Sequence, residues 1–296
     1  MPADSAAVAA PPAAANAAAA WRHAWLGPPL LALAAIFLYP LALIARQAFT
    51  EEGEGTSLQP LLSVVRSGFF TQAVLNTLEI AIAATAGCLA LGFVFALVLS
   101  FVPFPGSRVV SRLIDSVIAL PTFLVALAFT FLYGSSGLLN GLVMSGLHLS
   151  TPPVNFLYSA WGVILAEVTV YTPFAMRPLI AAFSLLDRAQ IEVASSLGAR
   201  PARIVRQIIL PAALPALLAG GSLCLLLTVN EFGIVLFIGA KGVVTLPLLI
   251  YDKAIQESDY SAACVIALIN VGLSILLFAL YRTVVNRLGG RHAGVV

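Results

Sequence analysis

Five polar residues lie inside long apolar runs of this chain, and they are the first places to look for chemistry. They are Glu167, Thr228, Asn230, Glu231 and Asn270. A polar or ionisable side chain at membrane depth is costly and is by default a candidate for function. We therefore take these five residues as candidates for lining a pathway. A structural role, as a hydrogen bond between helices, is an equal alternative for them.

The residue types that carry enzyme chemistry do not cluster in this sequence. Three cysteines all fall in apolar runs, odd in number and without metal-type spacing: Cys88, Cys224 and Cys264. Burial as small core residues is the expectation for them. Three histidines are scattered through flanks and loops: His23, His148 and His292. We predict no catalytic residue, no metal site and no cofactor bound by this chain.

Composition indicates a membrane protein. The chain is 60% hydrophobic and 9% charged, against about 25% charged residues in a soluble domain. Its net charge of +2 is too small to suggest a nucleic-acid partner. A helix needs about 20 apolar residues to span the hydrocarbon core. Six windows qualify, at Pro28–Ala48, Ala73–Ser100, Ile114–Tyr133, Ala160–Ala182, Ala212–Ile238 and Ala262–Tyr281.

The sequence predicts an all-α membrane protein, and its prolines and its longest non-spanning stretch indicate where the helices are interrupted. Leu120–Pro121 and Thr172–Pro173 are expected to interrupt the third and fourth spans, where neighbours must satisfy the freed backbone groups. The nearly uncharged stretch Gly134–Tyr158 is either a lip on the outer side or a helix lying at the membrane interface. Residues 1–24, rich in Ala and Pro, are predicted to be a disordered tail.

The placement of Lys and Arg predicts the orientation of the spans. With the N-terminus in the cytoplasm, eleven of the fifteen basic residues fall on the inner side: Arg22, Arg108, Arg112, Arg177, Arg188, Arg200, Arg203, Arg206, Arg282, Arg287 and Arg291. The other four fall on the outer side: Arg46, Arg66, Lys241 and Lys253. Both termini are therefore predicted to be cytoplasmic, in a multi-pass protein of the bacterial inner membrane.

One charged stretch, IEVASSLGARPARIVRQIILP at residues 191–211, stands between the fourth and fifth spans on the predicted inner side. Ser184 or Asp187 can cap a first helix, whose apolar face would hold Ile191, Ala194 and Leu197. Gly198 suits the left-handed residue that ends a helix, and Pro201 suits the first turn of the next. The prediction is two short helices joined at a glycine. From charge alone, a loop that only fixes topology is the plainer interpretation.

The spacing within this stretch resembles the EAA signature of ABC importer permeases. Its fixed positions are Glu192, Ala194, Gly198, Ile208, Leu210 and Pro211, with Val193 in place of one alanine. The resemblance implies a type I permease fold with six spans and cytoplasmic termini. It also implies that the loop 184–211, including Arg200 and Arg203, docks on an ATP-binding subunit. The implied domains are a first helix with an outer loop at 25–71, a permease domain at 72–286 and a cytoplasmic tail at 287–296.

Partners follow from the same resemblance, because the chain lacks the G-x-x-x-x-G-K-[ST] loop that cradles ATP. A dimer of ATP-binding subunits would use ATP and Mg, and a second permease chain, different from this one, would complete the membrane unit. A periplasmic binding protein would deliver the substrate. A self-sufficient secondary transporter is the alternative of another class, but we find no convincing inverted repeat.

Longer segments, among them NTLEIAIAATAGCLALGFVFALVLSFVPFPG and ALPTFLVALAFTFLYGSSGLLNG, resemble the permeases of 2-aminoethylphosphonate importers. Sulfate, molybdate, ferric iron and polyamine permeases are the alternatives within the superfamily. A tight phosphonate site would use Arg forks or helix N-termini, yet no Arg lies near a span centre. We therefore expect the separate binding protein to select the substrate and this chain to provide a weakly interacting passage.

Overall fold

A computed structural model describes residues 25–51 and 54–289 of the chain. The predicted N-terminal tail at 1–24 lies outside the described residues, as do residues 290–296 of the predicted C-terminal tail. Residues 287–289 of that tail belong instead to the last helix. In the described part the fold is helical, apart from a two-stranded antiparallel hairpin of β1 (Thr50–Glu51) and β2 (Glu54–Thr56).

Six helical segments are long and apolar enough to cross a membrane, as the sequence predicts. The helices in chain order are α2 (Gly27–Ala48), α3 (Gln59–Arg66), α4 (Gly68–Phe101), α5 (Ser107–Val117), α6 (Thr122–Tyr133), α7 (Leu138–Leu147), α8 (Ala160–Ser184), α9 (Arg188–Ser196), α10 (Pro201–Ile204), the π-helix η1 (Val205–Ile209), α11 (Leu210–Val229), α12 (Gly233–Ile238), α13 (Leu246–Tyr251), the π-helix η2 (Asp252–Gln256) and α14 (Tyr260–Gly289).

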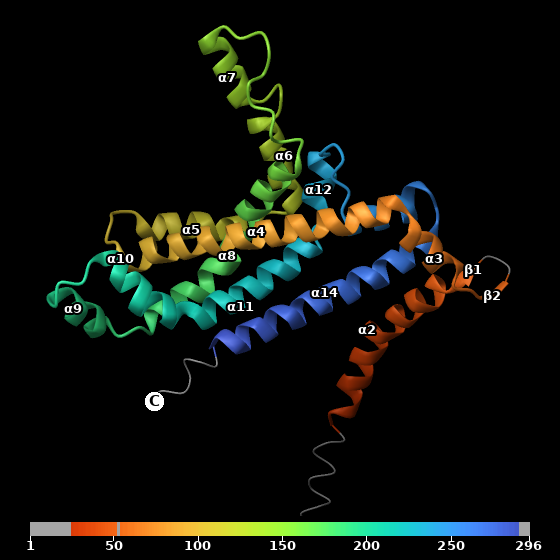
Figure 1. Ribbon diagram of the computed structural model, residues 1–296, viewed down its shortest axis with the longest axis horizontal. Coiled ribbons are helices and arrows are strands. Elements are labelled where there is room, and N and C mark those ends of the chain that lie inside the picture. The colour runs from red at the N-terminus through yellow and green to blue at the C-terminus, as the bar shows by residue number, and fades with distance from the viewer. Residues whose placement is uncertain (1–24, 52–53, 290–296) are drawn as a thin grey trace, which may run out of the picture.

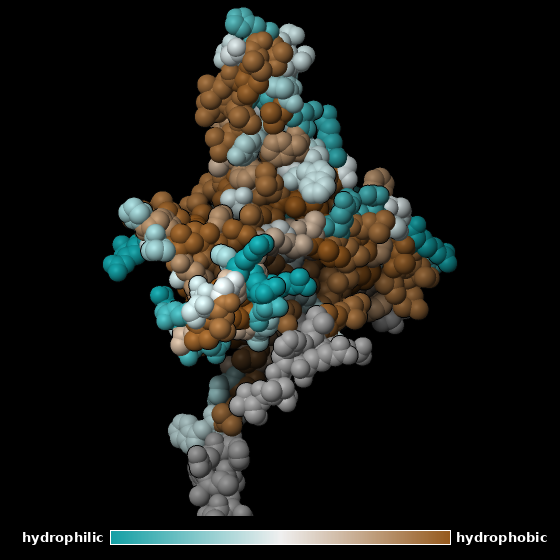
Figure 2. Space-filling view, turned by 60° about the vertical axis from the view of Figure 1, so that its left-hand side comes forward, coloured by the Kyte–Doolittle hydropathy of each residue, from teal (hydrophilic) through white to brown (hydrophobic). Residues whose placement is uncertain are grey.

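The centre of the fold is the packing of α4, α8 and α11, which lie side by side (Figure 1). Helix α14 packs on α11 and carries α2 on its other side. Helices α9 and α10 lie at one end of this bundle, and α3 with the hairpin lies at the opposite end (Figure 1). Much of the surface is hydrophobic, with hydrophilic residues gathered in patches (Figure 2), as lipid-facing helices require.

Small residues let the three central helices approach closely. A Cβ added to Gly92 of α4 would lie 3.0 Å from Cβ of Ala175 in α8. A Cβ added to Gly220 of α11 would lie 3.0 Å from Cα of the same alanine. Glycine and alanine at such contacts are typical of membrane helix interfaces, because they allow the backbones to meet. Ala175 therefore sits between two glycines and fixes the spacing of all three helices.

The third span does not follow the predicted window Ile114–Tyr133. Helix α5 ends at Val117 and α6 begins at Thr122, so the predicted interruption at Leu120–Pro121 is confirmed, while the bounds of the predicted window are wrong. Pro121 is the N-cap of α6, and proline disfavours helical backbone in the residue before it. Apolar residues instead continue through α6 and α7, where a span covers Thr122–Leu147.

Helix α5 is joined to the bundle by one ion pair and by Ile114, which packs against a cluster that includes Met176 and Phe183 of α8. Arg177 Nε of α8 donates to Asp115 Oδ1 at 3.0 Å, and both side chains are partly exposed. No residue of α5 is buried. An exposed pair of this kind is worth roughly 0–1 kcal/mol, so α5 is held more loosely than the central helices.

Pro173 does not interrupt the fourth span, contrary to the sequence prediction. Helix α8 runs unbroken from Ala160 to Ser184 with Pro173 and Pro178 inside it. The Thr172 hydroxyl donates to the Val168 carbonyl at 2.6 Å, and α4 and α11 pack against the helix. Burial among neighbours holds α8 together where Pro121, with less packing around it, breaks the chain.

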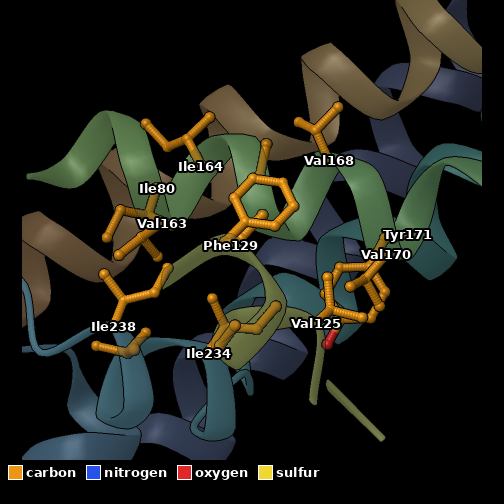
Figure 3. Packing of buried hydrophobic residues seen from close by; sticks show 14 of the residues in the cluster. Ile80, Val125, Phe129, Val163, Ile164, Val168, Val170, Tyr171, Ile234 and Ile238 are labelled. Atoms are coloured by element: carbon orange, nitrogen blue, oxygen red, sulfur yellow. The ribbon is translucent and has the colours of Figure 1, made fainter. Parts of the chain in front are cut away.

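The fifth span covers Pro201–Val229, so it begins and ends earlier than its predicted window Ala212–Ile238. Helix α11 ends at Val229, and α12 begins at Gly233. The short helix α12 turns aside to pack on α6. In Figure 3, Phe129 of α6 lies near Val163 of α8 and near Ile234 and Ile238 of α12. The apolar run is therefore divided between two helices at residues 230–232.

The stretch Gly134–Tyr158 contains a helix, α7, and a loop that returns along it. The Asn140 amide Nδ2 donates to the carbonyls of Gly134 and Val154, each at 2.8 Å, and its Oδ1 accepts from the Val154 N–H at 3.0 Å. This buried amide ties the loop to the start of α7. Whether α7 meets a binding protein or lies at the membrane interface stays a prediction.

Candidate functional site

The first candidate site is the loop that joins α8 to α11, which we call the α9–α10 loop (residues 185–209). The Asp187 side chain caps α9 by accepting from the Ala189 N–H at 3.0 Å. Gly198 has φ of +80° and donates its N–H to the Ser195 carbonyl at 2.9 Å. Pro201 stands in the first turn of α10. The predicted pair of short helices joined at a glycine is confirmed.

One face of the α9–α10 loop packs on the bundle. Ile204 and Ile209 are buried in a cluster with Met176 and Phe183 of α8, and the half-buried Ile191, Ala194 and Ile208 pack against the same cluster. Leu197 was predicted to share this apolar face but is 82% exposed. It follows the last residue of α9, where the chain turns away from the bundle.

The other face of the α9–α10 loop is free of contacts with the described bundle. The motif residues Glu192 and Gly198 and the three arginines of the second helix are exposed: Arg200, Arg203 and Arg206. Val193 and Leu197 are exposed apolar residues and border a shallow cavity of about 450 Å³ with Asp187 and Gln190. Exposed apolar side chains rimmed by charge mark a surface that another protein covers.

The second helix of this loop continues into the fifth span without a break. Helix α10, the π-helix η1 and α11 follow one another from Pro201 to Val229, and Leu210 and Pro211 of the motif lie at the start of α11, half-buried. A π-segment inside an α-helix is rare and is frequent at functional sites. A displacement of α10 would therefore be carried directly into α11.

The second candidate site is the break between α11 and α12, which places Glu231 in the interior. This residue is 6% exposed. Its Oε1 accepts from the Ile234 N–H at 2.8 Å, and its Oε2 accepts from the Tyr171 hydroxyl of α8. The first bond satisfies a free N–H at the start of α12, which explains why the helix ends and restarts here.

Glu167, one helical turn before Tyr171 on α8, lies in the same region. It is 1% exposed, and neither of its carboxyl oxygens has a hydrogen-bond partner among the described residues. The Tyr171 hydroxyl, one turn along α8 from Glu167, donates to Glu231, so both carboxyls lie in one region of the interior. A buried polar group without a partner costs about 1–3 kcal/mol, and an ionised one costs more. Glu167 is therefore the least compensated side chain in the described fold.

Amides and hydroxyls extend this polar region toward α4 and α14. Asn270 Nδ2 donates to Asn230 Oδ1 at 3.0 Å, and Asn230 Nδ2 donates to Ser274 Oγ at 3.3 Å. The hydroxyls of Thr228 and Thr85 lie 3.4 Å apart. All five predicted pathway residues thus come within α8, α11, α14 and the break. Asn230 is exposed while the other four are buried, so a pathway role stays a prediction.

Acidic residues gather at the opposite end of the bundle. A cavity of about 630 Å³ there is lined by residues that include Asp252, Lys253, Glu257 and Asp259. Lys253 pairs with Glu257 at 2.6 Å. Burial, with the nearby Glu257 charge as second cause, raises the pKa of the Asp252 carboxyl above its ordinary value. This end therefore presents an acidic hollow, in contrast to the arginines of the α9–α10 loop.

Tyr171, Asn140 and the Asp115–Arg177 pair escaped the sequence analysis. Tyr171 lies at i+4 from Glu167, a spacing that puts both on one face of α8, so a search for polar neighbours of the buried acid would have found it. Nothing in the sequence pairs Asp115 with Arg177, since 62 positions separate them. Asn140 lies in an uncharged stretch, and its hydrogen bonds to the Val154 backbone form only because the loop folds back along α7.

The described fold is thus a bundle of six apolar helices with the exposed α9–α10 loop at one end. Residues 88–290 match the family described as binding-protein-dependent transport system inner membrane component. The chain belongs to this family, and the prediction of an ABC importer permease is confirmed.

Two relatives and one solved structure show how far the similarity extends. The chain is 60% identical over 267 residues, 90% of this chain and 93% of the relative, to the "Putative 2-aminoethylphosphonate transport system permease protein PhnU" of Salmonella typhimurium. It is 30% identical over 273 residues, 91% and 94% of the two chains, to the sulfate transport system permease CysT of the same organism. A bacterial alginate ABC transporter, solved with a pentasaccharide-bound periplasmic protein, matches with TM-score 0.76 at 19% identity, over 91% of this chain and 95% of that one.

Proposed function

We propose that this chain is the permease through which 2-aminoethylphosphonate crosses the bacterial inner membrane in an ATP-driven importer. The observation that carries the proposal is the 60% identity to the PhnU permease over 90% of the chain. Similarity to the sulfate permease CysT is half as high in identity, so sulfate is the weaker candidate. Permeases that share higher identity over all six membrane spans are expected to share their substrate class.

The proposed assembly divides the work among several chains. The exposed face of the α9–α10 loop, with Glu192, Gly198, Arg200 and Arg203, would dock on the ATP-binding subunits, which hold ATP and Mg. A second permease chain would complete the membrane unit. A periplasmic protein would bring the substrate, as the periplasmic protein of the alginate transporter supports. We place ATP hydrolysis outside this chain and assign it no catalytic residue.

The proposed orientation puts both termini and the α9–α10 loop in the cytoplasm. Figure 1 supports the arrangement, because α14 runs back toward the end of the bundle where α9 and α10 lie. Arg203 and Arg206 lie at that end beside Arg188 and Arg200, in agreement with the excess of basic residues on cytoplasmic loops. A cysteine introduced into the loop should react with a membrane-impermeant maleimide in inverted vesicles and not in intact cells.

Uptake by cells tests the substrate. We expect labelled 2-aminoethylphosphonate to enter cells that carry this gene with its partner subunits, and not cells from which the gene is deleted. Unlabelled sulfate, phosphate and ferric iron in hundredfold excess should leave uptake unchanged. Uptake that persists in the deletion strain, or that sulfate abolishes, would reject this substrate.

Charge reversal at Glu192 tests the docking surface. The side chain is exposed on α9 and contacts no described residue through a hydrogen bond or ion pair, so Glu192→Lys should leave the fold intact. We expect substrate-stimulated ATPase activity of the assembled transporter to fall at least tenfold, because like or misplaced charge at an interface costs several kcal/mol. Substrate affinity of the isolated binding protein stays unchanged. Full ATPase stimulation in the variant would remove Glu192 from the interface.

A further inference from the structure

Among the described residues, no Lys or Arg forms an ion pair with the buried acids Glu167 and Glu231. The described residues contain two ion pairs, Arg177–Asp115 and Lys253–Glu257, and both lie elsewhere. Glu167 has no hydrogen bond on either carboxyl oxygen while being almost completely buried. Buried charges in proteins are normally paired or bind a ligand. In the part of the chain that the structure describes, nothing supplies a partner for Glu167, which points to a ligand.

The chemistry of the unfilled positions identifies that group. Glu231 already accepts from the Ile234 N–H and the Tyr171 hydroxyl, but a carboxylate offers about four acceptor positions. Glu167 offers all of its own. What the pair lacks is a compact donor with several N–H bonds, and a primary ammonium has three donors and no acceptor. In the part of the chain that the structure describes, no group of three or more metal-ligating residues exists, which disfavours a metal ion.

The break between α11 and α12 gives such a ligand a way in. Residues 230–232 lie between the two helices. The Glu231 N–H donates to the Thr228 carbonyl and the Phe232 carbonyl accepts from the Leu236 N–H, so movement of the break exchanges these terminal bonds and leaves the bonds inside each helix in place. Asn230 is exposed while the next residue, Glu231, is buried, so the break reaches the surface beside one of the two acids. Discontinuous helices with polar side chains at the break are a recurring way to build substrate and ion sites at the membrane midplane.

We propose that Glu167 and Glu231, together with Tyr171, form an intramembrane site for the primary ammonium group of the transported substrate. The site opens when the α11–α12 break moves during the transport cycle. This inference rests on the proposed function, since 2-aminoethylphosphonate carries one ammonium, and it adds which end of the molecule the permease recognises. The phosphonate end finds no arginine at this depth and is left to the separate binding protein.

Transport by the complete importer in proteoliposomes gives the first test. Glu167→Gln keeps the shape of the side chain and removes its charge, and we expect uptake of 2-aminoethylphosphonate to fall at least tenfold with normal assembly. The matched control is Glu79→Gln, which removes an exposed carboxyl from α4 and should transport as the wild type does. Wild-type uptake in Glu167→Gln would overturn the site. Absence of uptake in the wild type would instead overturn the proposed substrate.

Thermal stability of the assembled transporter without its binding protein gives the second test. We expect millimolar ethylammonium chloride to raise the melting temperature of the wild type, while ethylphosphonate and tetramethylammonium, which has no N–H donor, do not. Glu167→Gln should lose the ethylammonium effect and Glu167→Asp should retain part of it, which also serves if the glutamine variant fails to assemble. An equal effect of tetramethylammonium or KCl, or no effect of ethylammonium on the wild type, would overturn the proposal.

Discussion

Gly198→Val is expected to abolish ATP-dependent uptake while the permease still inserts into the membrane. Gly198 has φ of +80°, and a Cβ placed on it would meet no atom within 4 Å. The cost of the substitution is therefore one of backbone conformation and not of crowding. The left-handed region costs a non-glycine residue about 1–2 kcal/mol, and a β-branched one more. The turn between α9 and α10 should rearrange, and the docking face with it.

Gly106→Val is the matched control for this substitution. Gly106 has φ of +88°, and a Cβ there would also meet nothing within 4 Å. It precedes α5, at the same end of the bundle as α9 and α10 (Figure 1) but outside the α9–α10 loop. The same backbone strain is thus placed at a turn that takes no part in the proposed docking. We expect Gly106→Val to retain most of its uptake, measured with labelled substrate at equal membrane expression. Equal loss in both variants would mean that strain in any turn at this end of the bundle is enough.

The α9–α10 loop could be predicted from sequence because its signals are local. Asp187, one of the two predicted caps, caps α9. Gly198 has the positive φ that its position at the end of α9 suggests, and Pro201 starts the next helix. Each residue acts through backbone groups within one turn of itself. Leu197 was misplaced because its exposure depends on where the chain turns after α9, and that turn direction is set by packing.

The helix ends within the third and fifth apolar runs depend on side-chain contacts, which a hydropathy pattern does not indicate. The apolar run continues across residues 230–232, and the helix ends because the Glu231 side chain takes the N–H of Ile234 and the hydroxyl of Tyr171. Pro121 breaks the chain and Pro173 does not, although both are prolines in apolar windows. Neighbouring helices on both sides of α8 decide between these outcomes.

The difference between the two buried acids was also beyond prediction from the sequence. Glu167 and Glu231 are equivalent as acidic residues in apolar runs, yet one has two hydrogen-bond partners and the other has none among the described residues. Only the packing of α8 against the α11–α12 break distinguishes them. The sequence marks each acid as a candidate, whereas their common location and the lack of hydrogen-bond partners at Glu167 emerge only from the packing.

Gly220→Val is expected to prevent stable folding of the permease. A Cβ at Gly220 would lie 3.0 Å from Cα and 3.3 Å from the carbonyl oxygen of Ala175. These are backbone atoms of α8, so no side chain can rotate away, and α11 must move from α8. Overpacking of a core costs about 1–3 kcal/mol, occasionally more, and here it acts on the contact that sets the spacing of three helices. We expect the yield of monodisperse protein in detergent to fall at least tenfold.

Gly272→Val separates this crowding from the general effect of valine in a membrane helix. Gly272 lies inside α14, and a Cβ there would meet nothing within 4 Å. Both substitutions replace a glycine inside a helix by valine, so the difference in helix propensity is the same in the two variants. Gly272→Val should keep the wild-type melting temperature within a few degrees. If the two variants lost stability equally, the close approach of α8 and α11 would not be what holds the bundle together. A displacement of α10 would then have no tight contact through which α11 passes it on to α8.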